Sequence, residues 1–183
     1  MVQKGFYVNM KRCLGCSTCQ VACKDKFDLD IGEFGRRVTR YEGGKYPAPY
    51  VYSLSLACGH CDRPTCVEAC PNGAIAKDAE TGLVLLSQDR CKGCRKCEQA
   101  CPYGALSYIK ATGKMQKCDG CKDRLDAGKS PLCVSGCRAR ALEFGDIAAL
   151  KRAHPGWVHK IKNYADPAKT GPNVIFNPRP EAL

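Results

Sequence analysis

Sixteen cysteines in four groups of four constrain the fold of this 183-residue chain more than any other feature. Groups one and three share one spacing, in which three cysteines are two residues apart and a fourth follows after three more. Groups two and four have longer central spacers, of four and eleven residues. The groups are Cys13, Cys16, Cys19 and Cys23; Cys58, Cys61, Cys66 and Cys70; Cys91, Cys94, Cys97 and Cys101; and Cys118, Cys121, Cys133 and Cys137. Grouping this dense predicts loops that surround metal centres.

The spacing of groups one and three is the one that binds four-iron clusters in bacterial ferredoxins. In that run three close cysteines bind one cubane cluster, and the fourth binds its neighbour. A proline follows Cys70 and Cys101, as it does in the ferredoxin run. Sixteen thiolates at four per cluster therefore predict four [4Fe-4S] clusters with none left over.

Three other uses of cysteine fit less well. Disulfides gain most by closing long loops, and Met1–Lys11 lacks the apolar core of a secretory signal. Structural zinc suits groups two and four taken alone, but not three cysteines spaced two apart. A single redox C-x-x-C pair would not explain four groups. The alternative kept from a different class is a zinc-organised interaction module.

The composition supports the iron–sulfur interpretation. The formal net charge of +11 would, taken alone, suggest nucleic acid. Each oxidised cluster with its thiolates carries roughly −2, so four clusters would leave about +3. Lys92, Arg95 and Lys122 lie inside the cysteine loops, which indicates charge compensation. We expect no nucleic-acid partner, and no apolar run approaches the roughly 20 residues that cross a bilayer.

Hydrophobic residues other than cysteine are scarce. They fall from 44% with cysteine counted to roughly 35% without it, a thin supply for a core. The clusters are therefore expected to form part of the core, and folding should depend on their insertion.

The cysteine groups belong to an internal repeat of cluster loop, short helical turn and short strand. Turn residues predict that Ala74–Lys77 pairs with Leu83–Leu86, and Ala105–Lys110 with Lys114–Lys117. Gly5–Met10 is a further predicted strand. The predicted fold class is α+β: two ferredoxin-like dicluster modules in a pseudo-twofold arrangement, with short hairpins, short helices and an irregular C-terminal tail.

Domain boundaries follow the groups. Residues 1–31 plus 111–153 form one predicted module, which holds groups one and four. Residues 53–110 form an inserted module, which holds groups two and three. Residues 32–52, rich in Gly, Tyr, Arg and Pro, are expected to be an irregular connecting insertion. Residues 154–183 are expected to be a tail that docks on a partner or is disordered.

Two details at the C-terminal side complete the fold prediction. Ile147–Ala153 is expected to be the last helix, with Asp146 as its N-cap. After it, repeated Pro and Gly argue against regular structure. Val174, Ile175 and Phe176 favour docking of the tail over disorder.

Groups two and three are neighbours that share the pattern Cys-Pro-x-Gly-Ala, so we expect them to exchange their fourth cysteines. Groups one and four then pair by elimination. Cluster 1 is predicted to bind Cys13, Cys16, Cys19 and Cys137; cluster 2 Cys23, Cys118, Cys121 and Cys133; cluster 3 Cys58, Cys61, Cys66 and Cys101; and cluster 4 Cys70, Cys91, Cys94 and Cys97. His60 is expected to be a loop residue near a sulfur and not a ligand.

Further motifs give the chain a resemblance to a known family. They are Cys23-Lys24-Asp25, Arg36-Arg37, Tyr41–Gly44, Lys117–Cys121, Asp123-Arg124, Ala141–Gly145 and Gly171–Val174. With its cysteine groups, the chain resembles the four-cluster electron-transfer (beta) subunit of dimethyl sulfoxide reductase and related molybdopterin oxidoreductases. The resemblance covers nearly the whole chain.

The resemblance implies a linear path for electrons. Cluster 1 would face a molybdopterin-containing catalytic subunit, and cluster 4 would face an integral membrane subunit that reacts with quinol. In the nitrate reductase branch a Trp at the position of Cys94 gives a three-iron cluster, so Cys94 implies a four-iron cluster here. Arg138 stands where relatives often have Pro after the last cysteine.

The implied role is electron transfer without catalytic residues, so the chain would not be an enzyme by itself. It would lie peripherally at the cytoplasmic membrane, held by partners. Co-export with the catalytic subunit would place it on the extracytoplasmic side, and the cytoplasmic side is the alternative. The alternative function is a polyferredoxin-like carrier or a subunit of a soluble formate dehydrogenase or hydrogenase complex.

Overall fold

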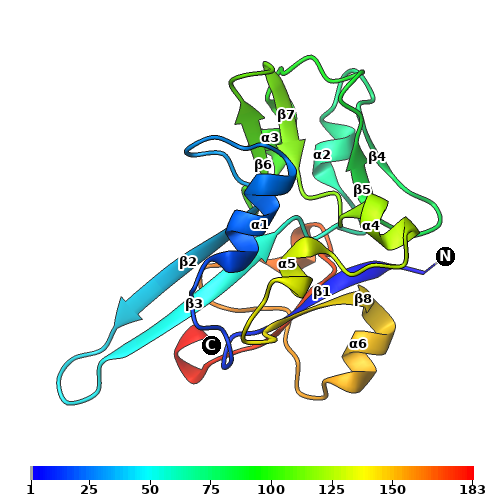
Figure 1. The fold of residues 1–183 in the computed structure, drawn as a ribbon. Coiled ribbons are helices and arrows are strands. Elements are labelled where there is room, and N and C mark those ends of the chain that lie inside the picture. Colours follow the sequence, from blue (N-terminus) through cyan, green and yellow to red (C-terminus); the bar gives the residue numbers. More distant parts are fainter. Residues whose placement is uncertain (1) are drawn as a thin grey trace.

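A computed structural model describes residues 2–183 and shows strand hairpins interspersed with short helices (Figure 1). Met1, the first residue of the predicted N-terminal module, lies outside the described residues. The mixture confirms the predicted α+β class. None of the helices formed by residues 2–183 combines the length and apolar character of a membrane-spanning segment.

A three-stranded sheet joins the beginning of the chain to its later parts. Its central strand β1 (Lys4–Asn9) pairs antiparallel with β8 (Leu142–Asp146) and parallel with β9 (Val174–Asn177). The prediction of a strand at Gly5–Met10 is confirmed to within one residue at each end. Helix α6 (Ile147–Ala153) follows β8, and the Asp146 side chain accepts a hydrogen bond from Ala148 N, as predicted.

Strand β9 corrects the prediction for the tail. Residues Val174–Asn177 are regular structure, and η1 (Pro167–Lys169) and η2 (Pro180–Ala182) are short 3-10 turns. Prolines lie before and after β9 but not within it. The strand can therefore pair with the edge of β1 that β8 leaves free. Val174, Ile175 and Phe176 are buried against this chain's own sheet, so they give no argument for a partner.

Residues 32–52 also differ from the prediction. Strands β2 (Arg36–Gly43) and β3 (Tyr50–Ala57) pair in register from Arg36–Ala57 to Gly43–Tyr50. They form a long hairpin that projects from the body (Figure 1). Tyr46 in its connecting loop is 96% exposed. The expectation of an irregular insertion is wrong because Gly and Pro cluster in the turn and leave β-branched and aromatic residues for the strands.

Two smaller hairpins match their predictions. Strand β4 (Ile75–Lys77) pairs with β5 (Val84–Leu86), and β6 (Leu106–Ile109) pairs with β7 (Lys114–Lys117). The remaining helices are short and follow the cysteine loops: α1 (Thr18–Lys26), α2 (Thr65–Glu68), α3 (Lys96–Ala100), α4 (Lys122–Asp126) and α5 (Leu132–Ser135).

The buried side chains form two main cores. The large core lies between the three-stranded sheet and the β2–β3 hairpin, and includes Phe6, Val8, Leu54 and Phe176. The small core lies between the two short hairpins, and consists of Cys66, Ala74, Ile75, Val84, Cys91, Cys97, Leu106 and Met115. Cysteines contribute to both cores, as the composition led us to expect.

Candidate iron–sulfur cluster sites

Three cavities are lined by cysteines, and each has the four cysteines of one predicted ligand set in its wall. The first contains Cys13, Cys16, Cys19 and Cys137, the second Cys58, Cys61, Cys66 and Cys101, and the third Cys70, Cys91, Cys94 and Cys97. The empty space in each, including the part that is open to solvent, is similar, about 330, 340 and 290 Å³. Each cavity draws three cysteines from one group and the fourth from another.

The remaining four cysteines are buried together beside α1. Burial and the neighbouring Cys133 raise the pKa of the Cys23 thiol to about 12. The pKa of Cys118 is raised well above its usual value by burial, and also by Cys23 and Cys133. Burial also raises the pKa of Cys121, and Cys133 raises it further. Packing of α1, which carries Cys23, against α5, which carries Cys133, agrees with these effects, and Cys118 lies in the same buried core as Cys133.

Short helices carry cysteines from one site to the next. Cys19 and Cys23 lie on α1, where a spacing of four places both on the same face, one turn apart. Helix α1 packs against α5, and α2 packs against α3. The Thr65 hydroxyl fastens the second pair by donating to Ala100 O at 2.9 Å. Each helix pair therefore spans two neighbouring sites.

Groups one and three use the same backbone conformation. The residues after their second cysteines, Ser17 and Arg95, both have φ of 60°. Gly93 stands between the first two cysteines of group three with φ of 66°, in the left-handed region. A Cβ added to Gly93 would lie 1.9 Å from Gly113 O, so the tight loop requires glycine there. The repeat seen in the sequence is thus a repeat of loop geometry.

Among residues 2–183, backbone amides approach several of the cysteine sulfurs. An N–H group that donates to a thiolate stabilises its charge and orients it for metal binding. The donors and acceptors are Ala74 N to Cys70 Sγ (3.2 Å), Ala141 N to Cys137 Sγ (3.3 Å), Met115 N to Cys91 Sγ (3.4 Å), His60 N to Cys58 Sγ (3.4 Å) and Gly120 N to Cys118 Sγ (3.4 Å).

Burial of the sulfurs fits a charged cluster better than free thiols. Burial raises the pKa of Cys66 to about 12 and the pKa values of Cys61 and Cys97 to about 11. Free thiols at these positions would stay protonated at neutral pH, whereas metal binding stabilises the thiolates. Among residues 2–183, no three His, Cys, Asp or Glu side chains form a site suited to a single metal ion. The sulfurs instead surround cavities.

Comparison with known proteins identifies the family. The family model for the 4Fe-4S dicluster domain matches residues 50–147. The B subunit of anaerobic dimethyl sulfoxide reductase from Escherichia coli K12 is 42% identical over 184 residues, which cover 96% of this chain and 89% of that protein. This chain is a member of the family of dimethyl sulfoxide reductase B subunits.

Other relatives agree with this identification. The corresponding B subunit of Haemophilus influenzae is 39% identical, covering 97% of this chain and 90% of that protein. Protein NrfC of Escherichia coli K12 is 35% identical, covering 93% of this chain and 83% of that protein. The predicted resemblance is confirmed. The chain is an iron–sulfur electron-transfer subunit of the kind used in anaerobic respiration, and [4Fe-4S] clusters are its cofactors.

Side-chain hydroxyls supply further donors to sulfur in this member of the family. Thr18 Oγ1 lies 3.4 Å from Cys16 Sγ, and Ser55 Oγ lies 3.3 Å from Cys19 Sγ. The hydrogen bond from Thr18 lowers the pKa of the exposed Cys16 thiol. These hydroxyls were not predicted from the sequence. Ser55 in particular lies 36 residues from the cysteine that it contacts.

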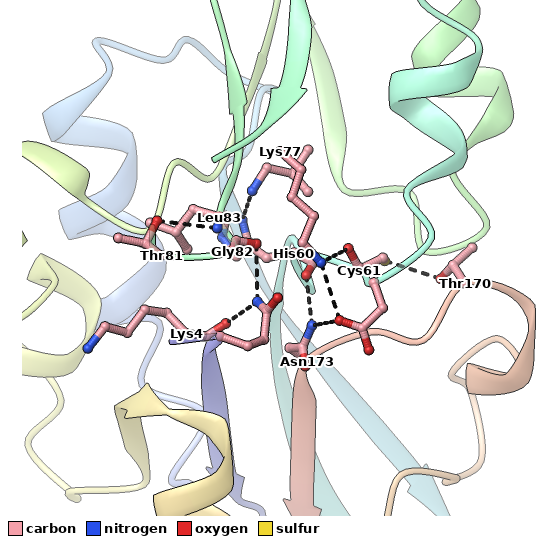
Figure 2. Close-up of polar contacts among 12 residues, drawn as sticks. Lys4, His60, Cys61, Lys77, Thr81, Gly82, Leu83, Thr170 and Asn173 are labelled. Atoms are coloured by element: carbon pink, nitrogen blue, oxygen red, sulfur yellow. Dashed lines mark hydrogen bonds and ion pairs between the residues drawn. The ribbon is translucent and has the colours of Figure 1, made fainter. Parts of the chain in front are cut away.

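The C-terminal segment holds the group-two loop in place. Thr170 Oγ1 donates to Cys61 Sγ at 3.1 Å, and Asn173 Nδ2 donates to His60 O at 2.9 Å (Figure 2). Lys77 Nζ donates to Cys61 O at 3.0 Å from the other side. This segment therefore shapes the surroundings of the predicted cluster 3 set.

His60 is fully buried, and its ring is oriented by the backbone. Nδ1 accepts a hydrogen bond from Val84 N at 3.0 Å, so the neutral ring carries its proton on Nε2. Burial, together with the positive charge of Lys117, lowers the pKa of His60 well below its usual value. The expected contact with a sulfur is made by the backbone N–H of His60 and not by the ring.

Two buried cations were not predicted. Arg36 and Lys117 are each 1% exposed. Lys117 Nζ donates to Cys118 O at 2.6 Å and also to Val84 O. Neither cation forms an ion pair with a carboxylate among residues 2–183. Positive charges of this kind suit sites that become negative when thiolates and clusters are present.

Proposed function

We propose that this chain relays electrons through four [4Fe-4S] clusters, between a quinol-reactive membrane subunit and a molybdopterin catalytic subunit. The observation that carries the proposal is the exposure of the cysteines. Cys16 and Cys94 are exposed, and every other cysteine is buried or partly buried. Cys16 belongs to the predicted cluster 1 and Cys94 to the predicted cluster 4. A path with those two clusters at its ends has its electron entrance and exit at the surface.

Contacts between the ligand sets support the order of the path. Burial raises the pKa of Cys19, and Cys133 raises it further, so the cluster 1 and cluster 2 sets lie close to each other. Burial raises the pKa of Cys118, and Cys58 is among the groups that raise it further, so the cluster 2 and cluster 3 sets lie close to each other. Packing of α2 against α3 links the cluster 3 and cluster 4 sets. Clusters 1, 2, 3 and 4 would then follow one another along the molecule.

The assignment of ligands to clusters is part of the proposal. The three cysteine-lined cavities support the predicted sets for clusters 1, 3 and 4, and the buried group beside α1 supports the set for cluster 2. The helix pairs support two modules, at residues 1–31 plus 111–153 and at residues 53–110. The shared backbone geometry of Ser17 and Arg95 supports a pseudo-twofold relation between them.

The chain's own residues would set how readily each site accepts an electron. When bound, [4Fe-4S] clusters supply one-electron carriers whose potentials respond to burial, charge and hydrogen bonds to sulfur. Amides at Ala74, Ala141 and Met115 would stabilise the thiolates, and buried cations would favour the reduced state. No bond of a substrate would change here, so catalysis would belong to the partner.

The partners follow from the same proposal. The names of the relatives describe one subunit of a dimethyl sulfoxide reductase, which supports a separate catalytic subunit. That subunit would dock near Cys16, and the membrane subunit would dock near Cys94. The chain would then be held peripherally at the cytoplasmic membrane, on the extracytoplasmic side if it is co-exported with the catalytic subunit.

The test combines metal analysis with two matched substitutions in the purified complex. Four clusters correspond to about sixteen irons per chain with matching sulfide. Cys94→Ser is expected to alter the electron paramagnetic resonance (EPR) signal of one cluster and to block electron flow from quinol. Cys16→Ser is expected to alter a different cluster and to block electron delivery to the catalytic subunit. Normal quinol-linked turnover in both variants would contradict the path, and four zinc ions per chain would contradict the cofactor.

A further inference from the structure

Arg36 is a fully buried cation whose side chain has unused hydrogen-bond donors. Its Nη1 donates to Ser55 O at 3.2 Å and to Ser55 Oγ at 3.1 Å. Its Nε and Nη2 have no partner among residues 2–183. The guanidinium lies over the Phe6 ring, 4.5 Å from its centre, which fixes its position. The remaining donors are therefore held in place without a protein acceptor.

The position of Arg36 connects the cluster 1 and cluster 2 sets. On one side, Ser55 Oγ accepts from Arg36 and lies 3.3 Å from Cys19 Sγ, a predicted cluster 1 ligand. On the other side, the adjacent Gly35 is so close to the predicted cluster 2 ligand Cys23 that an added Cβ would lie 2.7 Å from its sulfur. Arg36, the first residue of β2, therefore lies between the two ligand sets.

A buried guanidinium requires a negative partner. Removing an ion from water costs several kcal/mol unless an opposite charge compensates it. No carboxylate pairs with Arg36 among the described residues. The groups whose charge acts on Arg36 most strongly, and that raise its pKa against the effect of burial, are the thiols of Cys133, Cys118, Cys19 and Cys23. All four belong to the predicted cluster 1 and cluster 2 sets.

We propose that Arg36 is the shared counter-charge of clusters 1 and 2, and that it raises the reduction potentials of both. The inference rests on the proposed function, since it assumes that these two ligand sets hold clusters. Arginine stays protonated, so Arg36 contributes a fixed charge and takes up no proton. When cluster 1 or cluster 2 receives an electron from its neighbour, the positive charge of Arg36 stabilises the reduced cluster. The electron then moves to the next cluster, and no covalent bond changes. The charge of Arg36 also acts on His60 in the group-two loop, but less than the charges of Lys117 and Lys77 do, so its effect on cluster 3 is smaller.

The test uses the intact complex with three variants. Arg36→Gln removes the charge, Arg36→Lys keeps it, and Arg37→Gln is the control. Arg37 is the next residue of β2, is exposed, and carries the same charge. The measurements are iron per chain and the midpoint potential of each cluster from an EPR-monitored redox titration. Cys16→Ser and Cys121→Ser identify the signals of clusters 1 and 2.

We expect Arg36→Gln to shift the midpoint potentials of clusters 1 and 2 to more negative values, to shift that of cluster 3 by less, and to leave that of cluster 4 unchanged. Arg36→Lys should restore most of the shift, and Arg37→Gln should show none. A merely structural role would not distinguish Gln from Lys in this way. Unchanged potentials in Arg36→Gln with full iron content, or equal shifts in all four clusters, would overturn the inference.

Loss of iron in Arg36→Gln would also be decisive. Loss restricted to clusters 1 and 2, with retention in Arg36→Lys, supports the shared counter-charge, whereas equal loss from all four clusters in both variants overturns it. The unsubstituted complex separates the two proposals. If it lacks cluster 3 or cluster 4, the four-cluster path fails while Arg36 is still tested on clusters 1 and 2. If it lacks cluster 1 or cluster 2, both proposals fail.

Discussion

The large core and the small core hold their cysteines in different ways. The large core contains twelve buried residues other than cysteine, including the aromatic Phe6 and Phe176, and is closed by a three-stranded sheet. The small core contains five such residues between two hairpins of three or four residues per strand. Short two-stranded hairpins are marginally stable alone. The small core therefore depends on its metal centres for cohesion more than the large core does.

The two cores also differ in the groups that surround the sulfurs. In the large core, the side chains of Arg36 and Ser55 approach Cys19. Backbone amides donate to sulfur in both cores: Gly120 and Ala141 to Cys118 and Cys137 in the large core, and Ala74 and Met115 to Cys70 and Cys91 in the small core. Backbone donors persist through substitution, whereas side-chain donors do not. Mutation should therefore tune potentials in the large core and alter cluster retention in the small core.

Removal of iron should have the largest effect. Binding of structural zinc contributes about 10–16 kcal/mol in zinc-finger peptides, which is as much as the stability of a whole domain, about 5–15 kcal/mol. We expect the iron-free chain to be largely unfolded, with β4–β7 losing amide protection completely and β1 retaining the most. Hydrogen exchange by mass spectrometry measures both regions at once. A cooperative melt of iron-free protein near that of the loaded protein would refute this expectation.

Truncation of one buried side chain in each core should show how far each core depends on its metal centres. Phe176→Ala should lower the free energy of unfolding by about 3–5 kcal/mol, and Met115→Ala by about 2–5 kcal/mol. Only Met115→Ala should release iron before global unfolding, because Met115 lies in the wall of the cavity proposed for cluster 4. Denaturant unfolding followed by visible absorbance and by circular dichroism distinguishes the two events. Coincident iron release and unfolding in both variants would show that the cores are equally dependent on metal.

Lys117→Met should affect both cores, because Lys117 adjoins Cys118 in one and its charge acts on Cys66 in the other. Its loss leaves the carbonyls of Val84 and Cys118 without a donor, at about 1–3 kcal/mol each. We also expect a more negative potential for cluster 3. Lys114→Met, on the same strand but partly exposed, is the control. Equal effects of the two substitutions would argue against a special role for the buried charge.

Thr170→Val should have the smallest effect. It removes the hydroxyl that donates to Cys61 Sγ, a hydrogen bond worth about 0.5–1.5 kcal/mol. The potential of cluster 3 should become slightly more negative and the other three should not change. Thr170→Ser keeps the hydroxyl and should behave like the original protein in a redox titration. A shift of similar size in Thr170→Ser would attribute the effect to packing.

Local patterns in the sequence predicted a large part of this molecule. Cysteine spacing and the shared Cys-Pro-x-Gly-Ala pattern gave the predicted ligand sets, and three of these sets lie in the walls of three cavities. The assignment of the sets to clusters stays a prediction. Turn residues predicted the β4–β5 and β6–β7 hairpins. These features depend on short segments, so short segments were enough to find them.

What the sequence did not reveal depends on distant segments. Burial of Arg36 and Lys117 runs against the usual exposure of charged residues, and only the assembled cores produce it. Thr170 is 109 residues from the cysteine that it contacts. Strand β9 was missed because its neighbouring prolines indicate a break, while the free edge of β1 is invisible locally.

The placement of β1 between β8 and β9 has a consequence for biosynthesis. A ribosome releases residues 4–9 early, but their two partner strands emerge only after residues 142–146 and 174–177 have been made. A truncated product would present the bare edge of β1 to other proteins and leave Phe6 and Val8 uncovered. The sheet can therefore be completed only after β9 has been made, and until then the chain carries a strand edge that favours aggregation.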